Sequence, residues 1–350
     1  MAVQLSPIGK MPLEIIHLIV FFLGQSTPDR KSTPYLKNLR LTWKPFKKPA
    51  EEILFHSVHL SLLMFHLEAF WIISKTPHLA IHVREIVWLE NRRYQSDPVE
   101  EWLKTRQPPI PKNQITRVLD LFWEDDDIID DYEEGSAIPA PDLITLGLKQ
   151  LPRVATFVSY DMADWRLEPP KASDEYIFVV EAPYATEIPS EGFVRYLQPA
   201  MGHPESTVTS LVWKETLKPL EHPFSQAAFA GLTSIDIRFY ELPQWKNMVD
   251  CLHAASNLEK LFLTSVHGHG RHIFQRICLK RWNCLTVVRF EGIGVSDDGL
   301  FDFVERHYTL NHLVVVRCSL GVKTKRRIQE MQRGIKTEFD ADDGENQVQS

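Results

Sequence analysis

The C-terminal third of the chain repeats one short pattern of hydrophobic positions. An apolar residue is followed by two others, an apolar residue, one other, and a third apolar residue. The pattern begins at Leu232, Leu258, Leu285 and Leu310, so successive starts lie 26, 27 and 25 residues apart. The alternation that ends each unit is typical of a short strand with one buried face. The sequence therefore predicts one strand in each of four consecutive units.

The segments between these strands have the apolar spacing of amphipathic helices. Helices are expected over 243–255 and 271–282, and from Ser296, which is a good N-cap followed by two acidic residues. A unit of one strand and one helix, repeated every ~20–29 residues, is typical of leucine-rich repeats. Such units stack and bury one another. The expected fold class is α/β, with an irregular leucine-rich-repeat solenoid built on a curved parallel sheet.

Weaker copies of the pattern extend this body upstream. They begin at Val208, Val83 and, more faintly, Leu151. We therefore expect an irregular repeat domain over residues 57–334, interrupted by insertions at about 91–113, 124–142 and 164–206. A basic helix at 323–327 is expected to cap the repeats, and residues 335–350 to form a disordered acidic tail.

The N-terminus has a different pattern, which predicts three short helices over residues 8–56. The first begins at Pro12 and runs to about Leu23. It is apolar nearly all round, because Ile15, Leu18 and Phe22 lie opposite its other apolar residues. Such a helix is expected to be buried on both sides, so one side is predicted to meet another protein. Further helices are expected after Thr33 and over 50–55.

Residues 11–16, 35–46 and 51–55, taken in this order, resemble an F-box, and segments 57–61 and 83–88 resemble filamentous-fungal F-box proteins. The resemblance implies a three-helix hook that docks on the Skp-type adaptor of an SCF ubiquitin ligase, and through it on a cullin. The positions matching the apolar residues that serve this docking, or the packing of the hook, are Pro12, Leu13, Ile16, Ile19, Leu39, Leu41, Trp43 and Phe46. The alternative is that these residues only seal the first repeat.

Composition narrows the classes of partner. The chain has 350 residues, 44% of them hydrophobic, and a formal net charge of -7, so nothing favours a nucleic-acid partner. Its longest apolar stretch, 15–23, is shorter than the ~20 residues that span a bilayer. No membrane association is expected, and the protein is predicted to be cytoplasmic, nuclear or both. The four cysteines form no close pair, so reduced and mostly buried thiols are expected.

No motif in the sequence predicts catalysis. The chain lacks the nucleophile elbow, the phosphate-binding loop and the dinucleotide fingerprint. His267, His269 and His272 lie close together, but their spacing fits no closed zinc site. The acidic run 124–127 is interpreted as a solvated loop. We therefore expect no enzyme activity, no cofactor and no metal.

The leading hypothesis is a substrate-recognition adaptor in a ubiquitin-conjugation pathway, with the hook on the ligase and the repeat body on a protein target. Aromatic and arginine side chains dominate protein interfaces. The expected target contacts are therefore such residues facing out of the repeat strands, namely Trp213, Arg238, Tyr240 and Arg289. The competing hypothesis is a leucine-rich-repeat scaffold with no role in ubiquitin transfer.

Overall fold

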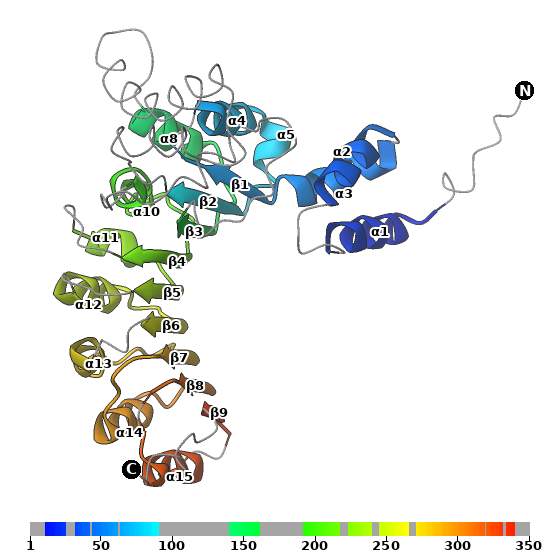
Figure 1. Cartoon of the computed structure of the whole chain (residues 1–350). Helices are drawn as coiled ribbons and strands as arrows, with labels where there is room; N and C mark the ends of the chain where they lie inside the picture. The colour runs from blue at the N-terminus through cyan, green and yellow to red at the C-terminus, as the bar shows by residue number, and fades with distance from the viewer. Residues whose placement is uncertain are drawn as a thin grey trace, which may run out of the picture. The chain divides into compact units, whose positions relative to one another are not determined.

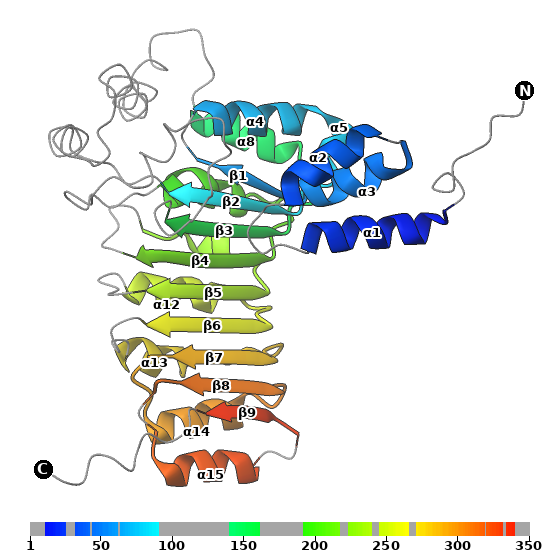
Figure 2. The same ribbon diagram turned by 45° about the vertical axis from the view of Figure 1, so that its right-hand side comes forward.

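The computed structural model describes residues 11–25, 32–42, 44–61, 64–90, 140–161, 192–217, 223–239, 245–265, 271–318, 320–331 and 334–339. The protein is α/β, and nine strands form an open parallel sheet in chain order from β1 to β9 (Figures 1 and 2). The chain divides into two compact units. The first contains the described residues up to 87 and those over 140–154, and the second contains 88–90, 155–161 and those from 192 onward.

The first unit begins with the three helices that the sequence predicts. They are α1 (Leu13–Gln25), α2 (Ser32–Thr42) and α3 (Lys44–Leu54), and they pack against one another. The third begins six residues before the predicted start at residue 50, so Pro49 lies inside it. Proline removes one backbone hydrogen bond from a helix interior. The helix tolerates this loss because Phe46 and Ala50 are buried against its neighbours.

The described part of the first unit continues with a strand and three further helices. These elements are β1 (Ser57–Leu60), α4 (Met64–Lys75), α5 (Pro77–Ala80) and α8 (Ala140–Lys149), and α4 packs against both β1 and α8. The strand β2 (Glu85–Glu90) follows α5 and contains the boundary between the two units.

The second unit contains the predicted repeats. Its strands are β3 (Thr156–Asp161), β4 (Ser210–Leu217), β5 (Ser234–Phe239), β6 (Lys260–Ser265), β7 (Val287–Glu291), β8 (His312–Val316) and β9 (Lys336–Phe339). Its helical segments are η3 (Phe193–Leu197), α10 (Gln198–Met201), α11 (Gln226–Phe229), α12 (Trp245–Ala254), α13 (Arg271–Ile277), α14 (Asp297–Arg306) and α15 (Val322–Met331). The strands and helices expected from the repeat pattern are thus confirmed.

The parallel register explains why the hydrophobic pattern repeats. Leu211, Ile235, Leu261, Val288 and Leu313 face one another across successive strands, and all are buried. Two residues further along each strand, a second row is also buried. This row consists of Trp213, Ile237, Leu263, Phe290 and Val315. Both rows lie beneath α11 to α14, which follow one face of the sheet (Figure 1).

The ends of the predicted irregular segments are more ordered than expected. Residues 91–113, 124–139 and 164–191 lie outside the described residues, but 140–142 belong to α8 and 193–201 are helical. Residues 336–339, which the sequence placed in the acidic tail, form β9 parallel to β8. The charged residues of β9 are compatible with a strand because they alternate with half-buried ones.

A buried carboxylate holds the start of η3. Glu90 accepts hydrogen bonds from Trp88 Nε1 at 2.8 Å and from the backbone N–H groups of Gly192 and Phe193, each at 3.0 Å. Backbone N–H groups at a helix start attract negative charge. The sequence had no signal for this contact, since more than 100 residues separate Glu90 from Gly192.

All four cysteines are free, as expected from the sequence. Burial raises the pKa of Cys251 and of Cys278 to about 12. Cys284 is exposed and Cys318 is half-buried, so only part of the expectation of burial is met. None of the helices in the described part of the chain has the length and apolar character needed to cross a membrane.

A buried histidine makes the second unit sensitive to acid. His307 Nδ1 lies 2.7 Å from Phe303 O, and Nε2 accepts a hydrogen bond from Trp282 N–H at 3.1 Å. Burial, with a smaller contribution from Arg306 and Arg281, lowers the pKa of His307. Protonation of Nε2 would place its N–H group against the backbone N–H group of Trp282, so two hydrogen-bond donors would face each other. The ring is therefore held neutral, with its proton on Nδ1.

We expect the free energy of unfolding of the second unit to be lower at pH 5 than at pH 7.5. The pKa of His307 is lower in the folded than in the unfolded state, so the unfolded state binds the proton first. This stability is complete above the unfolded value of about 6.5 and is lost as pH falls below it. Urea unfolding at both values measures the effect. His307→Asn should weaken the unit at pH 7.5 and reduce its pH dependence; equal pH dependence in both proteins would contradict the assignment.

Candidate functional site

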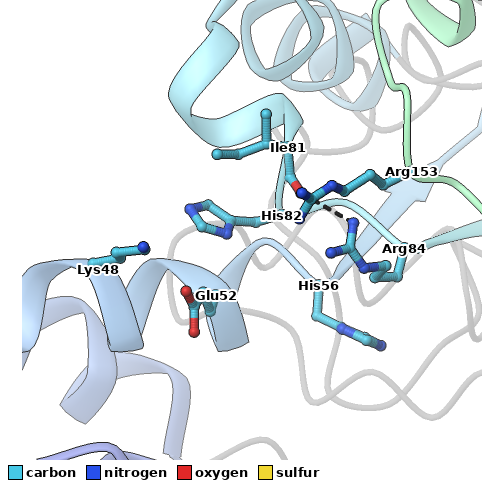
Figure 3. Close-up of a pocket in the computed structure, with 7 residues that line it drawn as sticks. All are labelled: Lys48, Glu52, His56, Ile81, His82, Arg84 and Arg153. Carbon is cyan, nitrogen blue, oxygen red and sulfur yellow. Dashed lines mark hydrogen bonds between the residues drawn. The ribbon is translucent and has the colours of Figure 1, made fainter. Parts of the chain in front are cut away.

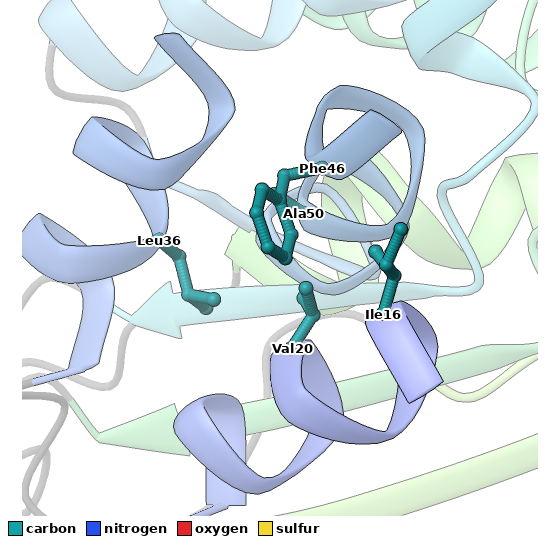
Figure 4. Close-up of a cluster of buried hydrophobic side chains, with 5 residues drawn as sticks. All are labelled: Ile16, Val20, Leu36, Phe46 and Ala50. Carbon is teal, nitrogen blue, oxygen red and sulfur yellow. The ribbon is translucent and has the colours of Figure 1, made fainter. Parts of the chain in front are cut away.

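The N-terminal helices enclose a small apolar core. Ile16 and Val20 of α1 point toward Leu36 of α2 and toward Phe46 and Ala50 of α3 (Figure 4). These two residues of α1 lie four apart, which places them on one side of the helix. The core therefore fixes which side of α1 faces its neighbours and which side faces outward.

The opposite side of α1 is an exposed apolar surface. Ile15, Leu18, Phe21 and Phe22 are 42%, 50%, 49% and 60% exposed. Since each residue advances a helix by about 100°, these four positions are centred roughly 180° from Ile16 and Val20. The rings of Phe21 and Phe22 are in edge contact, with centroids 6.0 Å apart. We call these four residues the outer face of α1.

Four exposed large apolar side chains on one side of a short helix are uncommon on a protein that acts alone. Fully burying one large apolar side chain is worth about 1.5–3 kcal/mol. Covering four half-exposed side chains is therefore worth roughly 3–6 kcal/mol before the costs of association. The sequence correctly placed Ile15, Leu18 and Phe22 opposite the other apolar residues of this helix, and the structure adds Phe21 to them.

The residues singled out by resemblance to the F-box differ in how far they are buried. Ile16 and Phe46 are buried in the core of the N-terminal helices, so they support the fold rather than contact a partner. Ile19 and Leu39 are half-buried, whereas Pro12 and Leu41 are exposed. The side chains of Leu13 and Trp43 lie outside the described residues. Leu41 is 77% exposed.

A second candidate surface lies on the side of the sheet opposite the buried rows. In register across four strands, it presents Asp236, Phe262, Arg289 and Val314. Burial raises the pKa of Asp236, and Lys214 and Arg289 counteract that effect. Phe262 is half-buried, Val314 is buried and Arg289 is exposed. Aromatic and arginine side chains such as Phe262 and Arg289 are enriched in protein interfaces.

Two arginines share one carboxylate on this surface. Arg289 donates to Glu291 Oε2 from Nε at 3.0 Å and from Nη2 at 2.6 Å. Arg317 donates to Glu291 Oε1 from Nη2 at 2.6 Å. Paired hydrogen bonds from arginine to carboxylate have a defined geometry, so the guanidinium of Arg289 is held in one orientation.

The predicted target contacts differ in their placement. Arg238 and Arg289 are exposed on the outward side of their strands, as expected. Trp213 is 1% exposed and packs edge-on against Phe193 and Phe224, so the expectation that it faces outward is wrong. Its indole occupies the row filled by Ile237 and Leu263 in the next strands. Tyr240 lies outside the described residues.

Within the described residues, no group of three side chains suited to a metal ion occurs. His267 and His269 fall outside these residues, and His272 is exposed at the start of α13. No protein-family model matches the sequence, and a comparison with curated proteins gives no significant match.

Proposed function

We propose that this protein is a non-catalytic adaptor: its N-terminal helices bind the Skp-type subunit of an SCF ubiquitin ligase, and its repeat-like body binds a protein target. The observation that carries the proposal is the outer face of α1, which remains exposed after the helix has buried Ile16 and Val20 in its own core. Helix α1 is apolar on two sides, but only one of these sides packs against the other N-terminal helices. The F-box resemblance supplies the identity of the second partner.

The structure refines which residues would make the contact. Ile15, Leu18, Phe21 and Phe22 offer the largest exposed apolar area on α1, and Leu41 is available on α2. Ile16 and Phe46 would act by holding α1 against α3. The binding surface is thus proposed to be the outer face of α1, with the resemblance-derived core residues as its support.

The body is proposed to hold the target on the outward side of its sheet. Arg238, Phe262 and Arg289 combine charge with apolar area on this side, and Glu291 orients Arg289. Simultaneous binding of ligase and target raises the effective concentration of one near the other. Ubiquitin transfer itself would be carried out by the ligase, in the cytoplasm or nucleus.

The second candidate function is a protein-interaction scaffold with no role in ubiquitin transfer, in which α1 only seals the first repeat. That model needs the outer face of α1 to be covered by the chain itself. The exposure of Phe22, at 60%, favours an external partner instead.

Replacing Leu18 and Phe22 together by aspartate is expected to weaken binding to a purified Skp-type adaptor by roughly 100-fold or more. Each side chain is about half exposed, so each loses roughly 0.8–1.5 kcal/mol of apolar burial and gains a charge that the interface would desolvate. Surface plasmon resonance with the immobilised adaptor measures the change. The matched control replaces Leu279 and Tyr308, which are 69% and 68% exposed in the second unit, by aspartate.

The control variant should bind like the wild type. Failure of the wild-type chain to bind the adaptor would disprove the ligase role and leave the scaffold model. Undiminished binding by the Leu18→Asp, Phe22→Asp variant would show that the outer face of α1 is not the contact.

A further inference from the structure

A basic pocket lies in the first unit, separate from the outer face of α1. It has a volume of about 310 Å³. Three stretches of chain line it: Lys48, Glu52 and His56 from α3 and the turn after it, Ile81, His82 and Arg84 from the segment between α5 and β2, and Arg153 from the turn after α8 (Figure 3). The lining residues lie in α3 and in turns next to helices or strands, and their side chains surround a common space.

The charges around the pocket are unbalanced. Lys48, Arg84 and Arg153 are cationic, His56 and His82 lie beside them, and Glu52 is the one acidic side chain among the lining residues that the structure describes. Within the described residues, Arg153, Arg84 and Lys48 form no ion pair with an acid. Cations gathered without matching carboxylates create a local positive potential that favours an anion.

The arginines are positioned rather than free to spread apart. Arg84 donates from Nη1 to Ile81 O at 3.0 Å, which leaves its other N–H groups for a ligand. Arg153 extends toward the same space from the turn after α8 and lies near Arg84 (Figure 3). Guanidinium groups present several donors in one plane and match the oxygens of a phosphate group.

His82 lies among both the cationic and the acidic side chains of this region. Its ring is mostly buried, and burial lowers its pKa. Glu52 and Glu51 raise the pKa, while Lys48 and Arg84 lower it further. A bound dianion would add negative charge beside the ring, and the pKa of His82 would then rise.

We propose that this pocket binds a phosphate monoester, that is, a phosphate group carried on a larger molecule. The cationic lining accounts for the phosphate. The volume accounts for the ester, because about 310 Å³ leaves room for the atoms attached to the phosphate as well as for the phosphate itself. This inference does not depend on the role proposed for α1.

The test uses isothermal titration calorimetry of the full-length chain at low ionic strength, with phosphoserine capped at both ends as the probe. Saturable binding is expected, and it should weaken as salt is added because the pocket is open to solvent. Inorganic phosphate and capped serine are titrated in parallel. The ester should bind more tightly than inorganic phosphate, and capped serine should not bind. Equal or tighter binding of inorganic phosphate would overturn the ester assignment.

Two variants locate the site. Arg84→Gln with Arg153→Gln should weaken binding of capped phosphoserine by about tenfold or more, whereas Arg326→Gln, an exposed arginine of α15 in the second unit, should leave it unchanged. Glu52→Gln removes the opposing carboxylate and should strengthen binding by about two- to fivefold. A misfolded protein could not produce that gain.

Side-chain NMR of His82 provides an independent readout. Its pKa should rise on saturation with capped phosphoserine. Absence of binding, binding that survives the double arginine variant, or an unchanged pKa of His82 would each overturn the proposal.

Discussion

Val20→Asp is expected to unfold the three N-terminal helices. Val20 has no exposed surface and lies between Leu36, Phe46 and Ala50. The core residues that the structure describes are apolar, so none of them can pair with the new carboxylate. An unpaired buried charge typically costs about 3–5 kcal/mol. The cost is comparable with the whole stability expected of a core this small, so loss of the bundle and of any binding through α1 should follow.

Hydrogen exchange followed by mass spectrometry measures this effect locally. A chain with two compact units is not expected to unfold in one step. Peptides from α1, α2 and α3 should exchange fast in the variant, and those from β5 to β8 should keep wild-type protection. Phe22→Asp, two residues away on the outer face, is the control and should not change exchange. Wild-type protection in Val20→Asp would mean that α1 is not packed as described.

Val20 and Phe22 also show how much of the packing of α1 can be predicted from the sequence. Helical spacing separates Ile16 and Val20 from Leu18 and Phe22 without any structure. Spacing alone does not say which of two apolar sides meets α3. That choice depends on the partners that Leu36 and Phe46 supply, and these come from later segments. For the same reason, the F-box resemblance selected Ile16 and Phe46 along with surface positions.

The repeating strands could be predicted because each one lies between strands with the same pattern of buried positions. A residue in the third apolar position of one unit is covered by the same position in adjacent units, as for Ile237, Leu263 and Phe290. Trp213 occupies this position in β4, so its burial was already implied by the pattern. For Trp213, the place in the repeat is a stronger signal than the preference of tryptophan for interfaces.

The basic pocket and the Glu90 contact had no comparable signal. Lys48 lies in α3, His82 lies before β2, and Arg153 lies in the turn after α8. Lys48 and Arg153 are exposed cations of an ordinary kind in their own segments. Glu90 follows four apolar residues and lies where the strand pattern would continue. Its role depends on Gly192, which approaches it only in the folded chain. Contacts between irregular segments follow no repeat in the sequence, so the hydrophobic periodicity cannot predict them.

Gly292→Ala is expected to destabilise the second unit by about 2–5 kcal/mol. Gly292 follows β7 with a φ of 65°, where an alanine costs roughly 1–2 kcal/mol. A Cβ there would also lie 2.3 Å from the carbonyl oxygen of Ser265 at the end of β6. The obstacle is backbone held in the sheet, so neither side can move without breaking strand contacts. Gly292 N–H also donates to Val316 O at 2.9 Å, which opposes its displacement.

The same substitution at Gly231 provides the control. A Cβ there would meet nothing closer than Val208 O at 3.8 Å, so a change within about 0.5 kcal/mol is expected. Urea unfolding of both variants, followed by tryptophan fluorescence, gives the comparison. Because Gly292 comes directly after Glu291, displacement of this turn should also release Arg289 and Arg317 and weaken target binding on the sheet. Equal stability of the two variants would show that the left-handed turn after β7 is not required for the fold.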